Sequence, residues 1–321
     1  MLIDRWLENK LDGSINPLRV VATIVAVCNL SCRHCFWHHD LEEKTVNDWT
    51  RQAKLIASWG ATVGYAGRML TPKGLAFLQA CLEAGVEKIG IVDHGYTIFN
   101  APIELLRQLD YINISVDGVR ADHDIQRNKE GAFDKAWGAV LKLKDQGFDP
   151  IISSCLSPTN LGRWSEFEVM LADNDVPLSV AMISTADAVV ERETADFSDE
   201  KSCRMAFETL LNGVPKIINL YDLAHIEHLI PVLRTLPWKP DRIEGDALIV
   251  ELSSGTQLVY RPQSLMWSGE LNLRWDGKFY LPTLDGRTGT EAEPAMMPAG
   301  HSQSVNKLFT QEMRVWSRIL S

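Results

Sequence analysis

The sequence has no long hydrophobic run, no excess of basic residues and few cysteines. The longest uncharged apolar stretch, Val20 to Leu30, is far shorter than the roughly 18–20 residues that span a bilayer, so no membrane-spanning segment is expected. The N-terminal stretch MLIDRWLENKLDG contains acidic residues and no apolar run, unlike a signal peptide. These absences predict a cytoplasmic protein without a membrane partner.

The charge balance argues against a further class of function. The chain has 32 Lys and Arg against 42 Asp and Glu, which gives a formal net charge of −10. General nucleic-acid binding needs a basic surface, so no nucleic-acid partner is expected. Hydrophobic residues make up 45% and charged residues 23% of the 321 positions, which is ordinary for a globular protein and excludes a disordered or fibrous chain.

The six cysteines are too few for a disulfide framework, and they are unevenly spread. Cys28, Cys32 and Cys35 lie within eight residues, whereas the other three are far apart. In a reducing compartment a tight group of cysteines more often binds a metal than forms a bridge.

Short β-branched runs alternate with helical patterns through the first 185 residues. The strand-like runs include Val20–Val27, Tyr111–Val116 and Pro150–Cys155, and helical patterns such as Asn47–Trp59 and Gly131–Asp145 lie between such runs. This alternation is typical of βαβ units and a mainly parallel sheet. About six units of this kind predict an α/β fold, a partial (β/α)6 barrel.

The pattern changes after Thr185, where strand-like pairs and turns replace the regular alternation. A helix over Ser198–Leu211 is expected to begin at a capping box that starts with Ser198. We predict two domains, a barrel core over residues 1–185 and a C-terminal α+β extension over residues 186–321. The other elements expected in the extension are the strand pairs Asp246–Leu252 with Thr256–Tyr260 and Leu271–Trp275 with Lys278–Leu281, and the closing helix Val305–Leu320.

The segment Cys28-Asn-Leu-Ser-Cys32-Arg-His-Cys35 directly follows the first predicted strand. Three thiolates at the spacing C-x3-C-x2-C suit three irons of a [4Fe-4S] cluster and leave the fourth iron open to another ligand. A zinc site is one alternative, because His34, His38 or His39 could supply a fourth ligand. Three unconnected core cysteines are another. The cluster is favoured, because structural zinc loops seldom follow the first buried strand of an α/β sheet.

With this loop, the sequence resembles the radical S-adenosylmethionine (radical SAM) superfamily over roughly residues 18–185. A C-x3-C-x2-C loop after the first strand of a partial (β/α)6 barrel is that family's defining motif. The resemblance implies that Cys28, Cys32 and Cys35 bind a [4Fe-4S] cluster and that S-adenosylmethionine (SAM) is the second cofactor. His34 falls where the family often has an aromatic residue near the adenine.

Further matches follow later strands. Ala66-Gly67-Arg68-Met69 takes the place of the family's Gly-Gly-Glu-Pro motif, where backbone groups bind the amino group of the cofactor's methionine. Arg68 replaces the acidic residue, so a backbone contact could persist but a carboxylate contact could not. Ser115-Val116-Asp117-Gly118 matches the family's Ser-Leu-Asp-Gly, and Arg127 follows it. The resemblance implies that Ser115 and Arg127 hold the methionine portion of SAM and that Asp117 belongs to the same cofactor-binding segment.

The C-terminal extension resembles an auxiliary-cluster domain that has lost its cysteines. Residues 271–282 are similar to the hairpin of that domain, yet no cysteine follows Cys203. We therefore interpret the segment as a scaffold or substrate cover and favour a redox-neutral reaction over one that needs an auxiliary cluster. Cys155 ends the fifth predicted strand, where barrel side chains face the active site, and is the candidate catalytic residue, a hydrogen-atom donor.

The leading hypothesis is an enzyme that cleaves SAM reductively to a 5′-deoxyadenosyl radical, which abstracts hydrogen from a small metabolite or a peptide. Epimerisation, rearrangement or cross-linking would follow. Such an enzyme implies an electron donor such as flavodoxin or ferredoxin. The alternative is a metal-binding regulatory or interaction protein without radical chemistry, for which Arg68 is the only positive indication.

Overall fold

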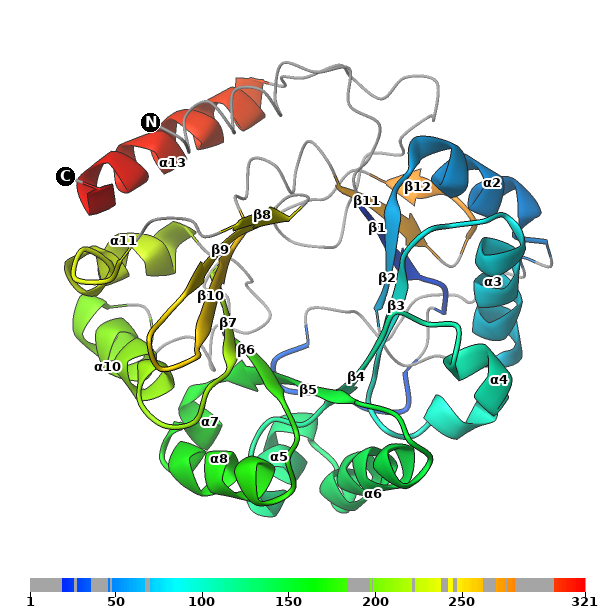
Figure 1. Cartoon of the computed structure of the whole chain (residues 1–321), viewed down its shortest axis with the longest axis horizontal. Helices are drawn as coiled ribbons and strands as arrows, with labels where there is room; N and C mark the ends of the chain where they lie inside the picture. The colour runs from blue at the N-terminus through cyan, green and yellow to red at the C-terminus, as the bar shows by residue number, and fades with distance from the viewer. Residues whose placement is uncertain are drawn as a thin grey trace.

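The described part of the chain is a curved sheet with helices on its outer face (Figure 1). The structure is a computed structural model. It describes residues 19–25, 28–35, 46, 48–66, 70–183, 197, 199–220, 223–237, 242–244, 247–261, 270–274, 276–280 and 303–320.

The strands form one twelve-stranded sheet in the order β12-β11-β1-β2-β3-β4-β5-β6-β7-β10-β9-β8. All neighbours from β11 through β1 to β7 and β10 are parallel, and the outer pairs β11–β12, β10–β9 and β9–β8 are antiparallel. The predicted partial barrel is confirmed. The strands are β1 (Arg19–Thr23), β2 (Thr62–Ala66), β3 (Ile89–Asp93), β4 (Tyr111–Ser115), β5 (Ile151–Leu156), β6 (Leu178–Met182), β7 (Ile217–Leu220), β8 (Arg242–Glu244), β9 (Ala247–Glu251), β10 (Gln257–Tyr260), β11 (Glu270–Arg274) and β12 (Phe279–Tyr280).

The helices lie between successive strands and around the outside of the ring (Figure 1). None of the helices described is long and apolar enough to cross a membrane. The helices are α2 (Thr50–Trp59), α3 (Pro72–Glu83), the 3-10 turn η1 (Ile98–Asn100), α4 (Ile103–Leu106), α5 (Arg120–Arg127), α6 (Ala132–Asp145), α7 (Pro158–Leu161), α8 (Trp164–Asp173), α10 (Glu200–Leu211), α11 (Leu223–Leu233) and α13 (Gln303–Leu320).

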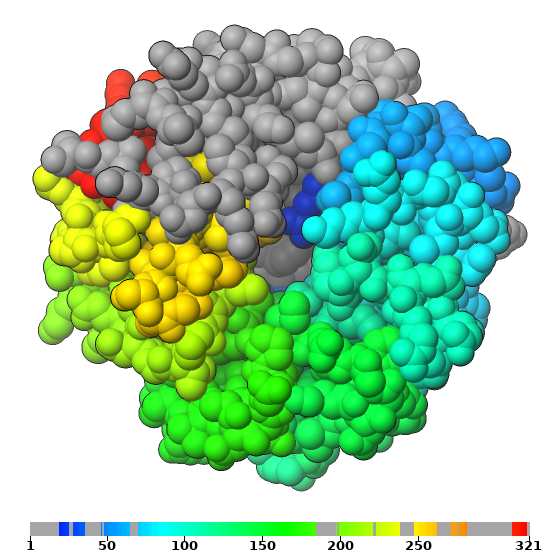
Figure 2. Space-filling view, viewed as in Figure 1, coloured from blue at the N-terminus to red at the C-terminus, as the bar shows by residue number. Residues whose placement is uncertain are grey.

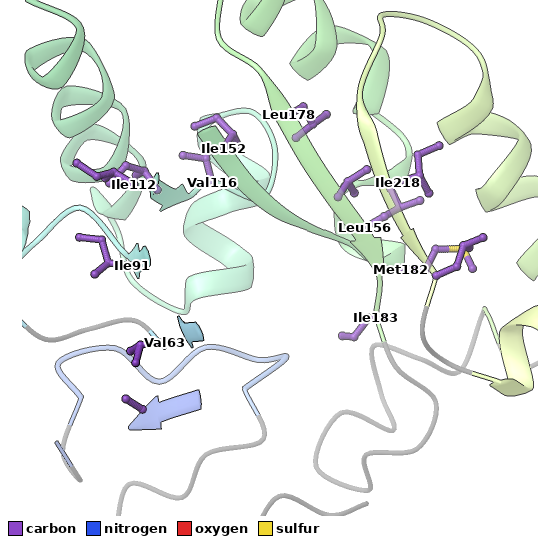
Figure 3. Packing of buried hydrophobic residues seen from close by; sticks show 14 of the residues in the cluster. Val63, Ile91, Ile112, Val116, Ile152, Leu156, Leu178, Met182, Ile183 and Ile218 are labelled. Carbon is purple, nitrogen blue, oxygen red and sulfur yellow. The ribbon is translucent and has the colours of Figure 1, made fainter. Parts of the chain in front are cut away.

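Side chains alternate between the two faces of the barrel strands. On β4, Ile112 and Ile114 are buried against the helices, while Ser115 lines the inner side. The same alternation on β5 places Ile152 outside and Ser153 inside. Figure 3 shows buried hydrophobic residues from β2 to β7, which belong to one hydrophobic core. The period of two is that of a strand whose faces meet different surroundings. The helix-facing side therefore carries the hydrophobic core, and the inner side is free to carry polar groups.

Local signals explain where several elements begin and turn. Pro72 occupies the first turn of α3, and the Thr71 hydroxyl accepts a hydrogen bond from the Gly74 amide at 3.3 Å. The predicted Asp276-Gly277 turn joins β11 to β12, with Gly277 at a φ of 78°. The predicted start of α10 was wrong. Asp199 caps this helix by accepting from two backbone amides, whereas Ser198 lies outside the described residues.

Strands on both sides of residue 185 belong to the same sheet. β11 pairs with β1, and β10 pairs with β7, so C-terminal segments extend both edges of the barrel. The closing helix α13 packs on the same core through Trp316, whose ring lies 4.6 Å from the Tyr260 ring between centroids. The Tyr260 hydroxyl also donates to the buried Glu312 carboxylate at 3.2 Å. The two segments that we predicted as domains thus share one sheet and one core.

Candidate active site

The cysteine loop follows β1 at the carboxyl edge of the parallel strands. Leu30 is buried and anchors the loop, and its amide donates to the Cys28 sulfur at 3.4 Å. The Cys35 amide closes a tight turn on the Cys32 carbonyl at 3.1 Å. All three thiols of the loop, Cys28, Cys32 and Cys35, are partly exposed. The fold therefore places the loop that carries the three thiols where the strands of an α/β barrel end, the usual place of active sites in such folds.

Helix α5, which the sequence analysis did not predict, holds this loop in place. The Arg33 amide donates to the Gln126 carbonyl at 2.8 Å, and the Lys129 ammonium donates to the Asn29 carbonyl at 3.4 Å. Asn128 ends the helix in the left-handed region, with a φ of 52°, and its side-chain amide donates to the Ser31 hydroxyl at 3.0 Å. The conformation of the loop thus depends on the C-terminal end of α5.

Arg127, the last residue of α5, joins the cysteine loop to the end of β4. Its guanidinium Nη2 lies 2.6 Å from Asp117 Oδ2, and its Nη1 donates to the Cys32 sulfur at 3.8 Å. Both members of the ion pair are buried, with 10% of the Arg127 side chain and 1% of the Asp117 side chain exposed. Burial favours the protonated form of Asp117, yet the guanidinium together with His34, His123 and the Cys155 amide lowers the pKa of this carboxyl below its usual value. The pair is therefore charged.

A buried polar network fixes the ends of β4 and β5 beside this ion pair. The Cys155 amide donates to Asp117 Oδ1 at 3.0 Å, and the Asn160 amide group donates to the carbonyls of Asp117 and Cys155 at 2.5 and 2.8 Å. Asn160 Oδ1 in turn accepts from the Ser157 amide at 2.8 Å. The Ser157 hydroxyl donates to Gln126 Oε1 at 2.9 Å, which closes the network onto α5. Satisfied buried networks of this kind hold one geometry.

Gly118, in the predicted Ser-Val-Asp-Gly match, permits this packing. Its φ is 134°, and a Cβ there would lie 3.2 Å from the Asn160 Cβ and 3.3 Å from the Asp122 Cβ. A side chain at this position would strain the backbone and crowd the network.

A cavity of about 390 Å³ opens beside the network, inside the barrel. Figure 2 shows the molecule hollowed at its centre. The structure brings five of the predicted site residues into the wall of this cavity, and these are His34, Ser115, Asp117, Arg127 and Cys155.

The other predicted cofactor-binding residues lie elsewhere in the fold or outside the described residues. Ala66 ends β2, next to β1 in the sheet, whereas Gly67 and Arg68 lie outside the described residues. The wall also contains residues that the sequence analysis missed, among them Arg19, Asn219 and Arg261. These residues lie far apart in the sequence and belong to no local motif, so only the strand order brings them together.

The three cysteines fit an iron–sulfur cluster by the chemistry of their donors. Three partly exposed thiols on one loop, with a cation at Cys32, can supply thiolate ligands. Burial raises the pKa of Cys32, while Arg127 acts in the opposite direction and favours its thiolate. In the described part of the chain, no group of three or more His, Cys, Asp or Glu side chains is already gathered around one metal position.

His123 is expected to make the folded chain sensitive to acid. Its ring is buried, and its Nδ1 accepts from the Asp117 amide at 3.0 Å. Burial and then the charge of Arg127 lower the pKa of His123 from 6.5 to about 3. The unfolded chain thus takes up a proton below pH 6.5 that the folded chain rejects, and the free energy of unfolding falls as the pH decreases toward 3.

The expected loss through His123 is on the order of 1.4 kcal/mol per pH unit, as for one proton. Urea unfolding over a series of pH values in this window measures the slope. A His123→Asn variant, which keeps an acceptor for the Asp117 amide, should have a slope shallower by that amount. Equal slopes in the two proteins would contradict this account of His123.

Comparisons with known proteins connect this geometry to a class. No family model matches the chain. The sporulation killing factor maturation protein SkfB of Bacillus subtilis (strain 168) is 23% identical over 181 residues, which cover 51% of this chain and 44% of SkfB. Fe-coproporphyrin III synthase of Methanosarcina barkeri (strain Fusaro / DSM 804) is 26% identical over 167 residues, which cover 49% of this chain and 42% of the synthase. The matches therefore span less than half the length of either relative.

The fold comparison extends over most of the chain. Streptococcus suis SuiB, bound to its precursor peptide SuiA, has a TM-score of 0.62 and 15% identity, and the match covers 90% of this chain and 64% of SuiB. SuiB is also known bound to S-adenosylmethionine. SkfB, Fe-coproporphyrin III synthase and SuiB are radical SAM enzymes. The resemblance to the radical SAM superfamily is confirmed in sequence and in fold.

Proposed function

We propose that the chain is a radical SAM enzyme that modifies a peptide. The observation that carries this proposal is the direct link between the cysteine loop and the cavity. Arg127 contacts both the Cys32 sulfur and Asp117, so the loop that would hold a cluster and the space that would hold a substrate share one residue. SuiB, which has the same fold, binds the precursor peptide SuiA, and this supports a peptide over a small metabolite as the substrate.

In this proposal Cys28, Cys32 and Cys35 bind a [4Fe-4S] cluster that supplies the electron for cleavage of SAM to a 5′-deoxyadenosyl radical. Ser115 lines the same cavity as Asp117, and we assign its hydroxyl to the methionine portion of SAM. Arg127 has five N–H donors, so it can hold a cofactor carboxylate and keep its pair with Asp117.

The remaining assignments to the cofactor follow the family resemblance. His34 also lines the cavity, beside Asp117 at 3.9 Å, and is assigned to the adenine side. We assign the backbone of Ala66, Gly67 and Arg68 to the amino group of SAM.

Anaerobic reconstitution tests the function. The protein is loaded with iron and sulfide and is then given SAM, a low-potential reductant or reduced flavodoxin or ferredoxin, and candidate peptides. We expect an iron–sulfur absorbance, about four irons per chain from one three-cysteine site, and release of 5′-deoxyadenosine. A zinc-loaded protein that never forms 5′-deoxyadenosine would instead support the metal-binding regulatory role. A content of about eight irons would contradict the inference that the C-terminal segment holds no auxiliary cluster.

We assign a hydrogen-atom donor role to Cys155. Its side chain lines the cavity, and burial, helped by the nearby Asp117 charge, raises its pKa to about 12, so it remains a thiol at neutral pH. A thiol can pass its hydrogen atom to a substrate carbon radical, which breaks the S–H bond and forms a C–H bond. The sulfur radical that remains is restored by one electron from the flavodoxin or ferredoxin and one proton from water. This route gives a redox-neutral product such as an epimer.

Replacement of Cys155 by alanine is expected to separate SAM cleavage from product formation. The Cys155→Ala protein should still release 5′-deoxyadenosine, because the cluster and SAM residues are unchanged, but it should form less final peptide product. Cys155→Ser is the matched variant, since its stronger O–H bond does not supply a hydrogen atom. Both are measured by chromatography of 5′-deoxyadenosine and mass spectrometry of the peptide in deuterated water. Full product yield in either variant would remove Cys155 from the reaction.

The expectation of a cytoplasmic location stays a prediction, consistent with an oxygen-sensitive cluster. Fractionation of the cells that make the protein would test it.

A further inference from the structure

The inner cavity contains two arginines that the proposed chemistry does not use. Arg19 begins β1, and Arg261 directly follows β10, where its amide donates to the Leu220 carbonyl at 2.9 Å. β1 and β10 lie on opposite sides of the barrel in Figure 1, yet both arginines line the same cavity. Two guanidinium groups thus enter one space from two walls.

The barrel wall is shaped to accommodate Arg19. Gly64 of β2, Gly90 of β3 and Tyr111 of β4 are register partners in one row across the sheet. A Cβ on Gly64 would lie 3.1 Å from Arg19 Nη2 and 3.5 Å from the Tyr111 hydroxyl, and a Cβ on Gly90 would overlap the Tyr111 ring at 1.9 Å. The two glycines therefore leave room for a guanidinium and a phenol hydroxyl at one point on the inner wall.

The facing wall is polar as well. Arg261 Nη1 donates to Asn219 Oδ1 at 3.3 Å, and the Asn219 amide group donates to the Ser179 hydroxyl at 2.9 Å. Asn219 and Ser179 face the cavity from β7 and β6. A guanidinium held by an amide oxygen keeps further N–H donors for a ligand, because it has five.

The charges that line the cavity favour an anion. The chain as a whole has a net charge of −10, yet the described lining contains three arginines and a single carboxylate, Asp117. Asp117 is already paired with Arg127 at 2.6 Å. Arg19 and Arg261 each also take part in a further interaction within the fold. A guanidinium stays protonated at neutral pH and has five N–H donors, so each can still contribute donors to a bound anion. Planar guanidinium groups bind carboxylates well, often through two parallel hydrogen bonds.

We propose that Arg19 and Arg261 form a subsite that binds a carboxylate of the substrate, so that the enzyme acts on an acidic peptide segment. This inference rests on the proposed function, because it names the chemistry of the substrate for that site. The carboxylate can come from an Asp or Glu side chain or from the C-terminus of a peptide. The arrangement places the anion on the inner barrel wall, away from the Arg127 contact with the cysteine loop.

Binding of small amino-acid derivatives to the reconstituted protein with SAM, without reductant, tests this subsite. The probes are N-acetyl-glutamate amide, its neutral counterpart N-acetyl-glutamine amide, and N-acetyl-alanine with a free C-terminal carboxylate, and affinity is measured by ligand-observed NMR titration. The side-chain carboxylate or the C-terminal carboxylate should bind about tenfold or more tightly than the neutral amide. Whichever of the two binds more tightly identifies the source of the anion. Equal affinity for all three probes would overturn the proposal.

Substitutions of Arg19, Arg261 and Gly64, with Arg51 as the control, test whether the two cavity arginines cause the preference for an anion. Arg19→Gln and Arg261→Gln should each weaken binding of the preferred anion by about ten- to a hundredfold, and the exposed Arg51→Gln should leave it unchanged. Gly64→Ala keeps both charges but crowds Arg19 Nη2, so it should weaken anion binding without changing the neutral probe. If Arg19→Gln fails to fold, the Gly64→Ala variant still tests the role of Arg19 in anion binding. Unchanged anion affinity in the folded variants would overturn the assignment.

SAM binding and cleavage are measured in the same proteins. If both arginine variants lose SAM affinity to the same degree as anion affinity, the arginines belong to the cofactor site and the subsite is refuted. A protein that cleaves SAM but binds no carboxylate would refute the subsite alone. A protein that binds the carboxylate but never assembles a cluster would refute the proposed function and leave the subsite standing.

Discussion

Replacement of Cys28, Cys32 or Cys35 by alanine is expected to abolish the cluster and with it all release of 5′-deoxyadenosine. A three-thiolate site has no spare ligand, so each single substitution leaves two protein ligands for three irons. We do not expect His34 to substitute for the missing ligand, because its ring lies in the cavity with Nε2 3.9 Å from Asp117 Oδ2. Iron and sulfide analysis with absorbance spectroscopy after reconstitution measures the loss.

The matched control for these three variants is Cys81→Ala. Cys81 is fully buried on α3, in the hydrophobic core, and burial raises its pKa to about 12. Its loss removes one small core group, which costs on the order of 1 kcal/mol of folding stability and leaves the loop untouched. Wild-type iron content in all three loop variants would refute the cluster assignment. Loss of iron in Cys81→Ala would show that the assay reports folding rather than ligation.

The second large effect is expected from Arg127→Ala, which should reduce both stability and SAM affinity. Removing one member of a buried ion pair leaves an uncompensated charge, here on Asp117, and costs about 3–5 kcal/mol. The variant also frees Cys32 and the end of α5 from their shared contact. Loss of a charge-assisted hydrogen bond to SAM should weaken its binding by about 1.5–3 kcal/mol. Urea unfolding of the metal-free protein and calorimetric titration of SAM into the reconstituted protein measure the two effects separately.

A double variant, Asp117→Asn with Arg127→Gln, distinguishes the roles of the pair. Removing both charges should recover much of the lost stability, because no buried charge remains unpaired, but SAM affinity should stay low.

In the wild-type protein the pair lowers the pKa of Asp117. Its stabilisation is therefore present above the ordinary Asp pKa of 3.8 and is lost as the pH falls through the lower value of the folded state. Unchanged SAM affinity in Arg127→Ala would remove this residue from the cofactor site.

Hydrophobic periodicity predicted the barrel strands well, because their outer side chains form the core. The predicted strands over Tyr111–Val116 and Pro150–Cys155 differ from the observed β4 and β5 by one residue at their ends. The first strand is shorter than the predicted Val20–Val27, ending at Thr23, and positions 26 and 27 lie outside the described residues. Hydrophobic periodicity shows which side of a strand faces the core, but it does not determine the residue at which the backbone leaves the sheet.

Helix α5 escaped prediction because its buried side is polar. Its sequence is Arg-Ala-Asp-His-Asp-Ile-Gln-Arg, and the side chains of Asp122, His123, Gln126 and Arg127 are buried while Ile125 is 49% exposed. Burial there is compensated by hydrogen bonds and charge rather than by apolar contact, so no apolar stripe marks the helix. The Asp124 side chain, which accepts from the amides of Gly131 and Phe133, is another stabilising contact that only the fold shows.

Only the cavity residues that belong to a sequence motif could be predicted from the sequence. Asp117 and Arg127 lie near each other in sequence and match the family pattern, whereas Arg19 and Arg261 lie far apart in the sequence. They line one cavity because the curved sheet runs from β1 through β7 and β10 pairs with β7, a long-range pairing that no local spacing encodes. The four-residue β7 was not predicted at all, and it supplies Asn219 to the cavity.

The position of β1 between β2 and β11 has a consequence for biosynthesis. The strand that leads into the cysteine loop pairs on one side with residues that follow it closely and on the other with Glu270–Arg274, roughly 250 positions later. Closing so long a loop is slow and carries an entropic cost, and on the ribosome the partner strand emerges long after β1. The nascent chain therefore carries an unpaired β1 edge until residues 270–274 have been synthesised, although α5, which holds the thiol loop, is made much earlier. We therefore expect stable loading of a cluster to follow this long-range pairing of β1 with β11 rather than to precede it.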